Sequence, residues 1–357
     1  MTQGLTIGKH RARFPLIQGG MGVRISGAGL AGHVARCGGI GLVAAAGLGL
    51  NSPHYDGRNF FAADPLALAD EIKKAYEIAP DGIIGVNCMV AVSNYDLMVK
   101  TACEAGAKLI VTGAGLPLKL PELTRDFPDV ALVPIVSSVK AAELIARKWH
   151  KGWNRLPDAV VVEDPETAGG HLGEKPENIG VGLYDHHETV RGVKAYFKNG
   201  WQLDIPVIAA GGVWNRADLL HALAEGADGV QMASRFVTTV ECDAADAYKQ
   251  AYISCRKEDI GLVMSPAGLP GRALLPNMER VLAYDRDRGI RCPSGCLKKC
   301  TYKSDQERFC IVHALDRAQR GEVDTGIIFC GTNAWRADRI ETVQEVFDEL
   351  FDLKAEG

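Results

Sequence analysis

Residues 206–236, PVIAAGGVWNRADLLHALAEGADGVQMASRF, contain one complete unit of the pattern that decides the fold. An apolar run at 206–211 ends in two glycines, an amphipathic stretch follows at 215–225, and a second apolar run occupies 229–233. Asn215 stands where a helix N-cap belongs, and Gly226 stands where a helix can end in left-handed backbone. The stretch therefore predicts a strand, a helix and a second strand of a buried parallel sheet.

The same alternation fills the chain from residue 14 to about residue 240. The expected strands are β-branched, nearly continuous apolar runs, and they lie at 14–19, 39–45, 82–88, 108–113, 131–137, 159–163, 206–211 and 229–233. The expected helices lie at 26–37, 64–79, 94–105, 118–126, 138–149, 186–199, 215–225 and 243–255, with Asn94, Ser138 and Asn215 as N-caps and Gly106 and Gly226 just past helix ends. Eight such units predict an α/β fold, the (β/α)8 TIM barrel. The first strand is followed by Gln18-Gly19-Gly20-Met21-Gly22, which lacks the G-x-G-x-x-G spacing of an open dinucleotide-binding sheet.

The alternation stops near residue 256, so we expect a barrel over 1–255 and a C-terminal extension over 256–357, with helices near 310–320 and 338–353. With 47% hydrophobic and 24% charged residues, the composition excludes disordered and low-complexity classes. The net charge of −4 gives no reason to expect nucleic acid as a partner. No uncharged apolar stretch is long enough to span a membrane, and the first residues lack the apolar core of a secretory signal. A cytoplasmic location is therefore expected.

The residues that follow each apolar run are the candidate ligand-binding residues, because a TIM barrel binds ligands at the carboxyl ends of its strands. They are Gly19, Gly20 and Met21 (first strand), Asn87 (third), Gly113 (fourth), Glu163 (sixth), Gly211 and Gly212 (seventh), and Ala233 and Ser234 (eighth). The seventh and eighth loops often bind phosphate in such barrels. The ligand would be flavin mononucleotide (FMN) or a sugar phosphate, and the alternative is that these glycines only form tight turns.

A histidine flanked by glycines follows the sixth strand, in the segment Gly169-Gly170-His171. Imidazole is the usual general acid or base near neutral pH. His171 is therefore the candidate catalytic residue, and an exposed loop histidine without a role is the alternative.

Four cysteines are spaced C-x3-C-x3-C-x9-C, at Cys292, Cys296, Cys300 and Cys310. Pro293 and Gly295 disfavour a helix, so we expect a loop folded around a ligand. Four thiolates suit a [4Fe–4S] cluster or tetrahedral zinc. Three close cysteines and a more distant fourth favour the iron–sulfur cluster over paired zinc knuckles, and free thiols are the third interpretation. Residues 286–320 hold nine Lys and Arg against four Asp and Glu, so this region has the charge to dock an acidic partner.

Six segments resemble the superfamily of FMN-dependent TIM barrels that contains nitronate monooxygenases and the enoyl-ACP reductases II. They are PLIQGGMG (15–22), GVNCMV (85–90), TGAGLP (112–117), VVEDPETAGGHLG (161–173), PVIAAGGVWN (206–215) and GADGVQMASRF (226–236). The C-terminal part resembles the [4Fe–4S]- and FMN-containing acyl-ACP dehydrogenase/isomerases of bacterial unsaturated fatty-acid synthesis. This second resemblance rests on the four cysteines and on ECDA (241–244), SPAGLPGRA (265–273) and Gly331-Thr332-Asn333.

The resemblance implies an FMN oxidoreductase with His171 as the catalytic acid/base. Gly20, Met21, Asn87, Glu163, Gly211, Gly212, Ala233 and Ser234 would line FMN, with Gly19, Gly113 and Gly170 expected beside them, and Cys292, Cys296, Cys300 and Cys310 would hold the cluster. The implied reaction oxidises decanoyl-ACP, a saturated medium-chain acyl-ACP, to its trans-2-enoyl form and isomerises that to the cis-3-enoyl form. Acyl carrier protein, O2 or another electron acceptor, and a second copy in a homodimer are the implied partners.

Three other functions remain open from the sequence. A nitronate monooxygenase would need FMN and a base but no cluster. An NAD(P)H-dependent enoyl-ACP reductase would use the same barrel, and an electron-transfer or redox-sensing protein would use flavin and cluster without a substrate of its own.

Overall fold

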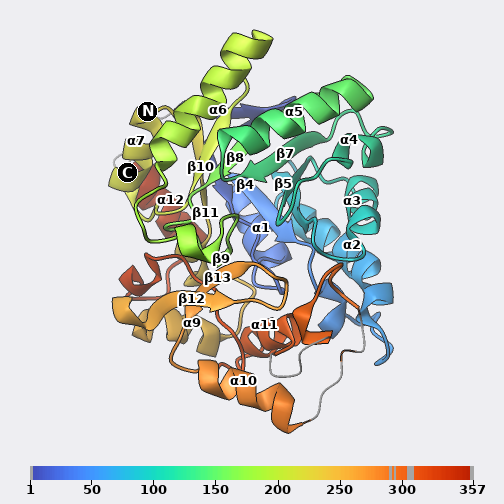
Figure 1. Ribbon diagram of the computed structural model, residues 1–357, viewed down its shortest axis with the longest axis vertical. Helices are drawn as coiled ribbons and strands as arrows, with labels where there is room; N and C mark the ends of the chain where they lie inside the picture. Colours follow the sequence, from blue (N-terminus) through green and yellow to red (C-terminus); the bar gives the residue numbers. More distant parts are fainter. Residues whose placement is uncertain (1–2, 289–291, 293–294, 304–308, 354–357) are drawn as a thin grey trace.

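The computed structural model describes residues 3–288, 292, 295–303 and 309–353. Eight parallel strands close into one barrel, in which β11 pairs with β3 and β10 pairs with β8 (Figure 1). The barrel strands are β3 (Leu16–Gln18), β4 (Ile40–Ala44), β5 (Ile83–Met89), β6 (Leu109–Gly113), β7 (Ala131–Val136), β8 (Val160–Glu163), β10 (Val207–Ala210) and β11 (Gly229–Met232). Each lies within or within one residue of an apolar run of the sequence, so the predicted TIM barrel is confirmed.

The barrel interior is packed with apolar side chains and is closed at its amino end. Leu42, Val111 and Val161 belong to this inner cluster. A hairpin of β1 (Leu5–Ile7) and β2 (His10–Ala12), which the sequence analysis did not predict, adds Leu5 and Ile7 to the same cluster. Because the amino end is sealed, ligands have access from the carboxyl end.

Seven helices surround the barrel at the predicted places: α1 (Ala28–Arg36), α2 (Phe60–Ile78), α3 (Tyr95–Glu104), α4 (Leu120–Leu123), α5 (Val139–Trp153), α6 (His186–Trp201) and α7 (Arg216–Ala224). The side chains of Ser138 and Asn215 cap α5 and α7 as predicted. The Asn94 side chain makes no cap bond, because its amide donates instead to Asp64 on α2, at 2.9 Å. Gly106 and Gly226, at φ 91° and 106°, end their helices in left-handed backbone.

The eighth barrel helix is not where the sequence pattern placed it. Residues 243–255 contain α9 (Asp246–Ser254), whose Tyr248 and Tyr252 pack into a separate cluster of the C-terminal region. The eighth position is taken by α12 (Val343–Phe351), which contacts α1 and α7. The α12 residue Phe351 stacks on Phe14 with ring centroids 4.2 Å apart. The chain thus leaves the barrel after β11 and the short α8 (Ser234–Val237) and returns about a hundred residues later. The division into units 1–255 and 256–357 stays a prediction.

The chain between α8 and α12 covers the carboxyl end of the barrel (Figure 1). Strands β12 (Ile260–Met264) and β13 (Pro270–Leu274) form a hairpin, and β13 also pairs with β9 (Gly170–His171) in an antiparallel sheet. The remaining helices are α10 (Met278–Asp287), α11 (Ile311–Gln319) and the 3-10 turns η1 (Leu48–Asn51), η2 (Pro176–Asn178), η3 (Lys257–Asp259), η4 (Thr301–Lys303) and η5 (Ala334–Arg336). The helices expected near 310–320 and 338–353 are confirmed as α11 and α12. No helix in the described part of the chain is long and apolar enough to cross a membrane.

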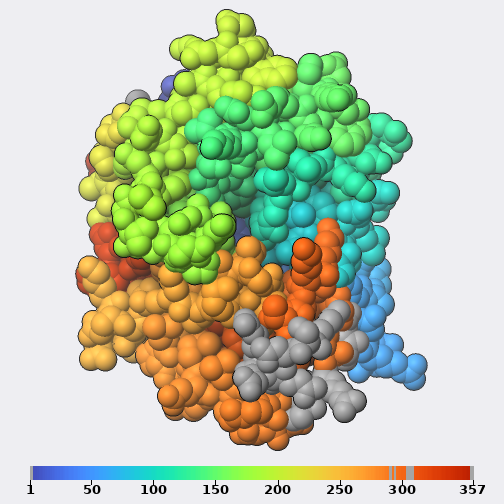
Figure 2. All heavy atoms as spheres, in the orientation of Figure 1, coloured from blue at the N-terminus to red at the C-terminus, as the bar shows by residue number. Residues whose placement is uncertain are grey.

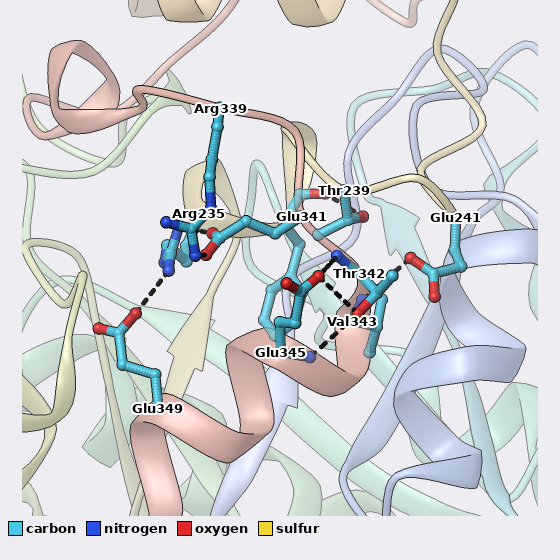
Figure 3. Close-up of polar contacts among 10 residues, drawn as sticks. Arg235, Thr239, Glu241, Arg339, Glu341, Thr342, Val343, Glu345 and Glu349 are labelled. Atoms are coloured by element: carbon cyan, nitrogen blue, oxygen red, sulfur yellow. Dashed lines mark hydrogen bonds and ion pairs between the residues drawn. The ribbon is translucent and has the colours of Figure 1, made fainter.

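A buried ion-pair network fastens the returning chain to the barrel (Figure 3). Arg235 of α8 pairs with Glu341 and, at 2.8 Å, with Glu349 of α12. The Arg235 and Glu341 side chains are 7% and 4% exposed. Glu341 also accepts from Arg339 at 2.7 Å, and Thr342 begins α12 with a capping box. The position of α8, directly after the last barrel strand, therefore depends on the C-terminal residues.

Candidate functional site

Two adjoining cavities lie at the carboxyl end of the barrel. The first is bounded by the loops after β8, β10 and β11, and the second lies over the ends of β3, β5 and β6. They share Glu163, Gly169, Gln231, Ala233 and Ser234, so they form one continuous space. Every residue expected to contact the cofactor lines one or both cavities: Gly19, Gly20, Met21, Asn87, Gly113, Glu163, Gly170, Gly211, Gly212, Ala233 and Ser234.

Glycine is required by geometry at several points of this wall. Gly211 and Gly212 have left-handed backbones, at φ 105° and 72°. A Cβ atom on Gly211 would lie 2.7 Å from Oγ1 of Thr167, and one on Gly20 would lie 2.3 Å from Cβ of Asn87. These positions therefore let backbone approach a ligand closely, which is how glycine-rich loops bind phosphate.

The C-terminal region completes the first cavity. The Gly331 amide donates to Oγ of Ser234 at 2.9 Å, and Nδ2 of Asn333 donates to the Gly212 carbonyl at 2.7 Å. The Thr332 amide donates to the Thr167 carbonyl at 3.0 Å. Residues 331–333 thus tie together three barrel loops. The sequence analysis used this segment only as a mark of resemblance, and nothing in its spacing to the barrel strands pointed to these contacts.

Gln231 is a site residue that the sequence analysis missed. It lines both cavities from the middle of β11, and its Oε1 is buried without a hydrogen-bond partner among the described residues. A buried acceptor left unpaired costs about 1–3 kcal/mol, so this oxygen fits a ligand that brings an N–H donor. The isoalloxazine ring of FMN carries such a group. The signal available in the sequence was the side-chain amide of Gln231, a polar group within the otherwise apolar run 229–233.

His171 lies on β9 between the second cavity and a third, apolar cavity. Its Nε2 is 2.7 Å from Oγ of Ser265, and its ring meets Phe329 edge-on at 5.0 Å between centroids. Burial lowers the pKa of His171 to about 4, so the ring is neutral at pH 7 and can accept a proton. Ser265 lies in the turn of the β12–β13 hairpin, 94 residues away in sequence, and the sequence pattern did not connect it to His171.

Glu163 ends β8 beside both cavities. Burial, and then the neighbouring Asp164, raise its pKa to about 7, while Arg272 acts in the opposite direction. The Arg272 guanidinium donates to the carbonyls of Ala168 and Pro165, the latter at 3.1 Å. Glu163 therefore gains or loses a proton near neutral pH, and Arg272 of β13 holds the loop that leads to His171.

The four cysteines meet in one apolar cluster of the C-terminal region, with Cys296 and Cys310 buried and Cys292 and Cys300 partly buried. Burial is the first cause that raises the pKa of Cys310, to about 12, and Cys296 contributes to the rise. In residues 3–288, 292, 295–303 and 309–353, no group of three or more His, Cys, Asp or Glu is placed to hold a metal ion. Pro293 lies outside the described residues. The donor chemistry fits an iron–sulfur cluster, whereas the described geometry does not form a metal site.

The barrel, its glycine-lined cavity and the neutral His171 are those expected of an FMN-dependent oxidoreductase of the TIM-barrel type. The family profile of nitronate monooxygenases matches residues 3–352, so the chain belongs to the nitronate monooxygenase family. The catalytic class predicted from the sequence is confirmed by this membership.

One curated protein and two solved structures are similar to this chain. A (3aS,4S,5R,7aS)-5-hydroxy-7a-methyl-1-oxo-octahydro-1H-indene-4-carboxyl-CoA dehydrogenase of Mycobacterium tuberculosis is 28% identical over 278 residues, which cover 77% of this chain and 67% of the relative. The structure of FabK from Thermotoga maritima superimposes with a TM-score of 0.71 at 25% identity, covering 96% of this chain and 92% of the other. The nitroalkane oxidase from Streptomyces ansochromogenes has the same fold, with a TM-score of 0.70 at 19% identity and 97% of each chain covered.

Proposed function

We propose that this protein oxidises an acyl thioester between its α and β carbons, with FMN as the bound electron acceptor. The observation that carries the proposal is a partly buried His171 that lies where the second cavity meets an apolar one, with a pKa lowered by desolvation so that its ring is neutral at pH 7. The similarity to a carboxyl-CoA dehydrogenase over 77% of the chain supports thioester chemistry. In its specific form, the proposal is conversion of a decanoyl-like acyl-ACP through the trans-2-enoyl to the cis-3-enoyl thioester.

The residues of the first two cavities fit FMN. Gly211, Gly212 and Ser234 would hold its phosphate, and Gln231 would accept a hydrogen bond from its ring. When bound, FMN supplies a two-electron acceptor for the hydride that leaves the β carbon. Residues 331–333 close the phosphate end, so the C-terminal region would help to retain the cofactor.

His171 has the properties that the proton steps require. A thioester carbonyl acidifies the hydrogens on the α carbon, and a neutral imidazole takes up one of them. Moving the double bond to position 3 requires removal of a proton from the γ carbon and its return to the α carbon, which one positioned histidine can perform. Ser265 contacts the imidazole through Nε2 and would fix the orientation of the ring.

The proposal includes a [4Fe–4S] cluster on Cys292, Cys296, Cys300 and Cys310. Acyl carrier protein would deliver the substrate, O2 or another acceptor would reoxidise the enzyme, and a cytoplasmic homodimer would be the working form. Iron and sulfide analysis of anaerobically purified protein tests the cluster. About four irons per chain support it, and a flavin spectrum without iron excludes it.

The test of the function is anaerobic incubation of the holoenzyme with decanoyl-ACP. We expect the flavin absorbance to bleach and enoyl-ACP to form, and we expect His171→Ala to retain FMN and lose both signals. Unchanged flavin absorbance with no enoyl product would contradict the proposal.

Nitronate oxidation is the second candidate, because the profile of that family spans residues 3–352. It would use His171 to position an alkyl nitronate, which is already the deprotonated form of a nitroalkane. Turnover of alkyl nitronates in air, without any reaction of acyl-ACP, would favour it. Rapid flavin reduction by NAD(P)H would instead indicate an enoyl-ACP reductase.

A further inference from the structure

A third cavity extends from His171 away from the FMN phosphate end. It shares five lining residues with the second cavity, so the two are connected: Val23, Ala46, Met89, His171 and Leu315. Its remaining walls are largely apolar side chains from two distant parts of the chain. The barrel supplies Phe60, Phe61 and Val92, and the C-terminal region supplies Cys296, Leu297, Ile311 and Val312.

The roof of this cavity is fixed by backbone pairing. Leu297 and Val92 form an antiparallel bridge. The Ser93 amide donates to the Cys296 carbonyl, and the Lys298 amide donates to the Ala91 carbonyl, both at 2.9 Å. The C-terminal segment, orange in Figure 2, lies against the blue-green face of the barrel. The cysteine-bearing segment is therefore part of the wall rather than a distant appendage.

The polar groups of the cavity are occupied by protein partners. Asp64 accepts from the Gly49 amide at 2.7 Å and from Nδ2 of Asn94 at 2.9 Å. Among the residues that the structure describes, neither Lys nor Arg lines the space. A phosphate, a sugar or a free carboxylate would lose its hydration here without gaining a cationic partner, and this is unfavourable. A hydrocarbon chain has no hydrogen bonds with water to lose, and its transfer from water into an apolar cavity is favourable.

We propose that this cavity binds the hydrocarbon chain of the substrate and that residues 297 and 311–315 set the preferred chain length. The inference rests on the proposed thioester oxidation, because it places the α and β carbons beside His171 and the rest of the chain beyond it. Each methylene that enters the cavity improves kcat/KM about fourfold until the cavity is full.

Val312→Phe tests the wall, because Val312 lines this cavity and not the second one. We expect the ratio of kcat/KM for decanoyl-ACP over butyryl-ACP to fall about tenfold or more, with butyryl-ACP little affected. Phe61→Ala enlarges the space and should raise the ratio for dodecanoyl-ACP over decanoyl-ACP. Val240→Phe is the matched control, because the Val240 side chain is exposed and lines no part of the cavity.

Calorimetric binding of decanoate and butanoate to the oxidised holoenzyme separates the cavity from the reaction. We expect decanoate to bind more tightly than butanoate, and we expect this difference to be lost in Val312→Phe and kept in Val240→Phe. That result would support the cavity as a hydrocarbon site, even if no thioester is oxidised and the proposed function fails. The inference would be overturned if all chain lengths are turned over and the kcat/KM ratios between chain lengths are unchanged in both Val312→Phe and Phe61→Ala. The proposed function would stand in that case. Thermal unfolding of each variant identifies a folding defect.

Discussion

Burial determines the protonation state of His171 and thereby its use as a base. The pKa of about 4 lies below the value of about 6.5 for an exposed imidazole. We expect the rate of flavin reduction by substrate to show no ionisation of a histidine near pH 6.5. Because Glu163 is expected to ionise near pH 7, stopped-flow measurements between pH 5 and 8 on wild type and Glu163→Gln check this, and a step near pH 6.5 that persists in Glu163→Gln would contradict it.

The same shift links His171 to stability. Between about pH 6.5 and 4 the unfolded chain binds more protons at this residue than the folded one, so its contribution to the free energy of unfolding decreases as the pH falls. Wild type should therefore lose stability relative to His171→Gln between pH 7 and 5. Urea unfolding of both proteins at the two pH values gives this difference, and an unchanged difference would show that the ring is solvated.

Ser265 is expected to act through His171 as a positioning residue. Ser265→Ala removes the partner of Nε2, so we expect flavin reduction to slow about tenfold or more, consistent with the strong dependence of proton transfer on alignment. The FMN content should remain that of wild type. Ser254→Ala is the control, because the Ser254 hydroxyl bonds only to carbonyls of its own helix. Equal rates in the two variants would exclude a positioning role.

Individual site residues were predictable where they follow apolar runs. Gly211, Gly212 and His171 could be found because the barrel rule converts strand ends into ligand positions. Gln231 could not be predicted, because it lies inside a strand. Ser265 could not be predicted, because it reaches His171 only through a hairpin that pairs with β9.

At the level of elements, the N-terminus of α1 is capped by a residue that lies far away in the sequence. Asp243 accepts from the amides of Gly27, Gly29 and Leu30, at 2.8, 3.1 and 3.1 Å, and so fills a position that a ligand anion could otherwise occupy. Asp243→Ala should lower the free energy of unfolding by about 2 kcal/mol, as expected for loss of a strong helix cap. Chemical denaturation measures the change.

Asp246→Ala provides the comparison for this cap, because Asp246 is exposed in the first turn of α9. We expect it to change stability by less than about 0.5 kcal/mol, as is usual for surface sites. Similar losses in both variants would mean that the contacts of Asp243 with α1 contribute little.

Elements were predicted well where burial on both faces leaves a continuous apolar run. This holds for all eight barrel strands, including β6 and β10. The assignment of the eighth helix to residues 243–255 was wrong because α9 is also amphipathic, and only packing decides which apolar face the barrel uses. Strand β9 has two residues, too few for any periodic signal.

For the whole molecule, the link between α8 and the C-terminal helix is expected to control both stability and cofactor retention. Glu341→Gln removes the buried carboxylate from Arg235 but leaves its contact with Glu349, so the loss should lie below the penalty of about 3–5 kcal/mol for a buried charge left unpaired. We expect a lower melting temperature and faster loss of FMN on dialysis, because Ser234 begins the same helix as Arg235. Thermal unfolding and flavin fluorescence measure the two effects.

Asp129→Asn is the matched control for this ion pair. Asp129 pairs with Lys9 at 2.6 Å, but the two side chains are 74% and 56% exposed. Exposed pairs are worth about 0–1 kcal/mol, so little change is expected in stability or FMN retention. If Glu341→Gln behaves like this control, the buried network does not hold the cofactor loop.

The sequence by itself determined the barrel, its ligand-binding end, the glycine-rich loops at that end and the candidate base. The reason is that strand burial, turn geometry and proton chemistry each restrict the residue type at a single position or over a short repeat. Only the tertiary structure decided that α12 closes the barrel, that Ser265 contacts His171, and that residues 331–333, Leu297 and residues 311–315 reach the two ends of the cavities. These contacts join residues about a hundred or more positions apart, and their strength comes from packing and desolvation that no local pattern records.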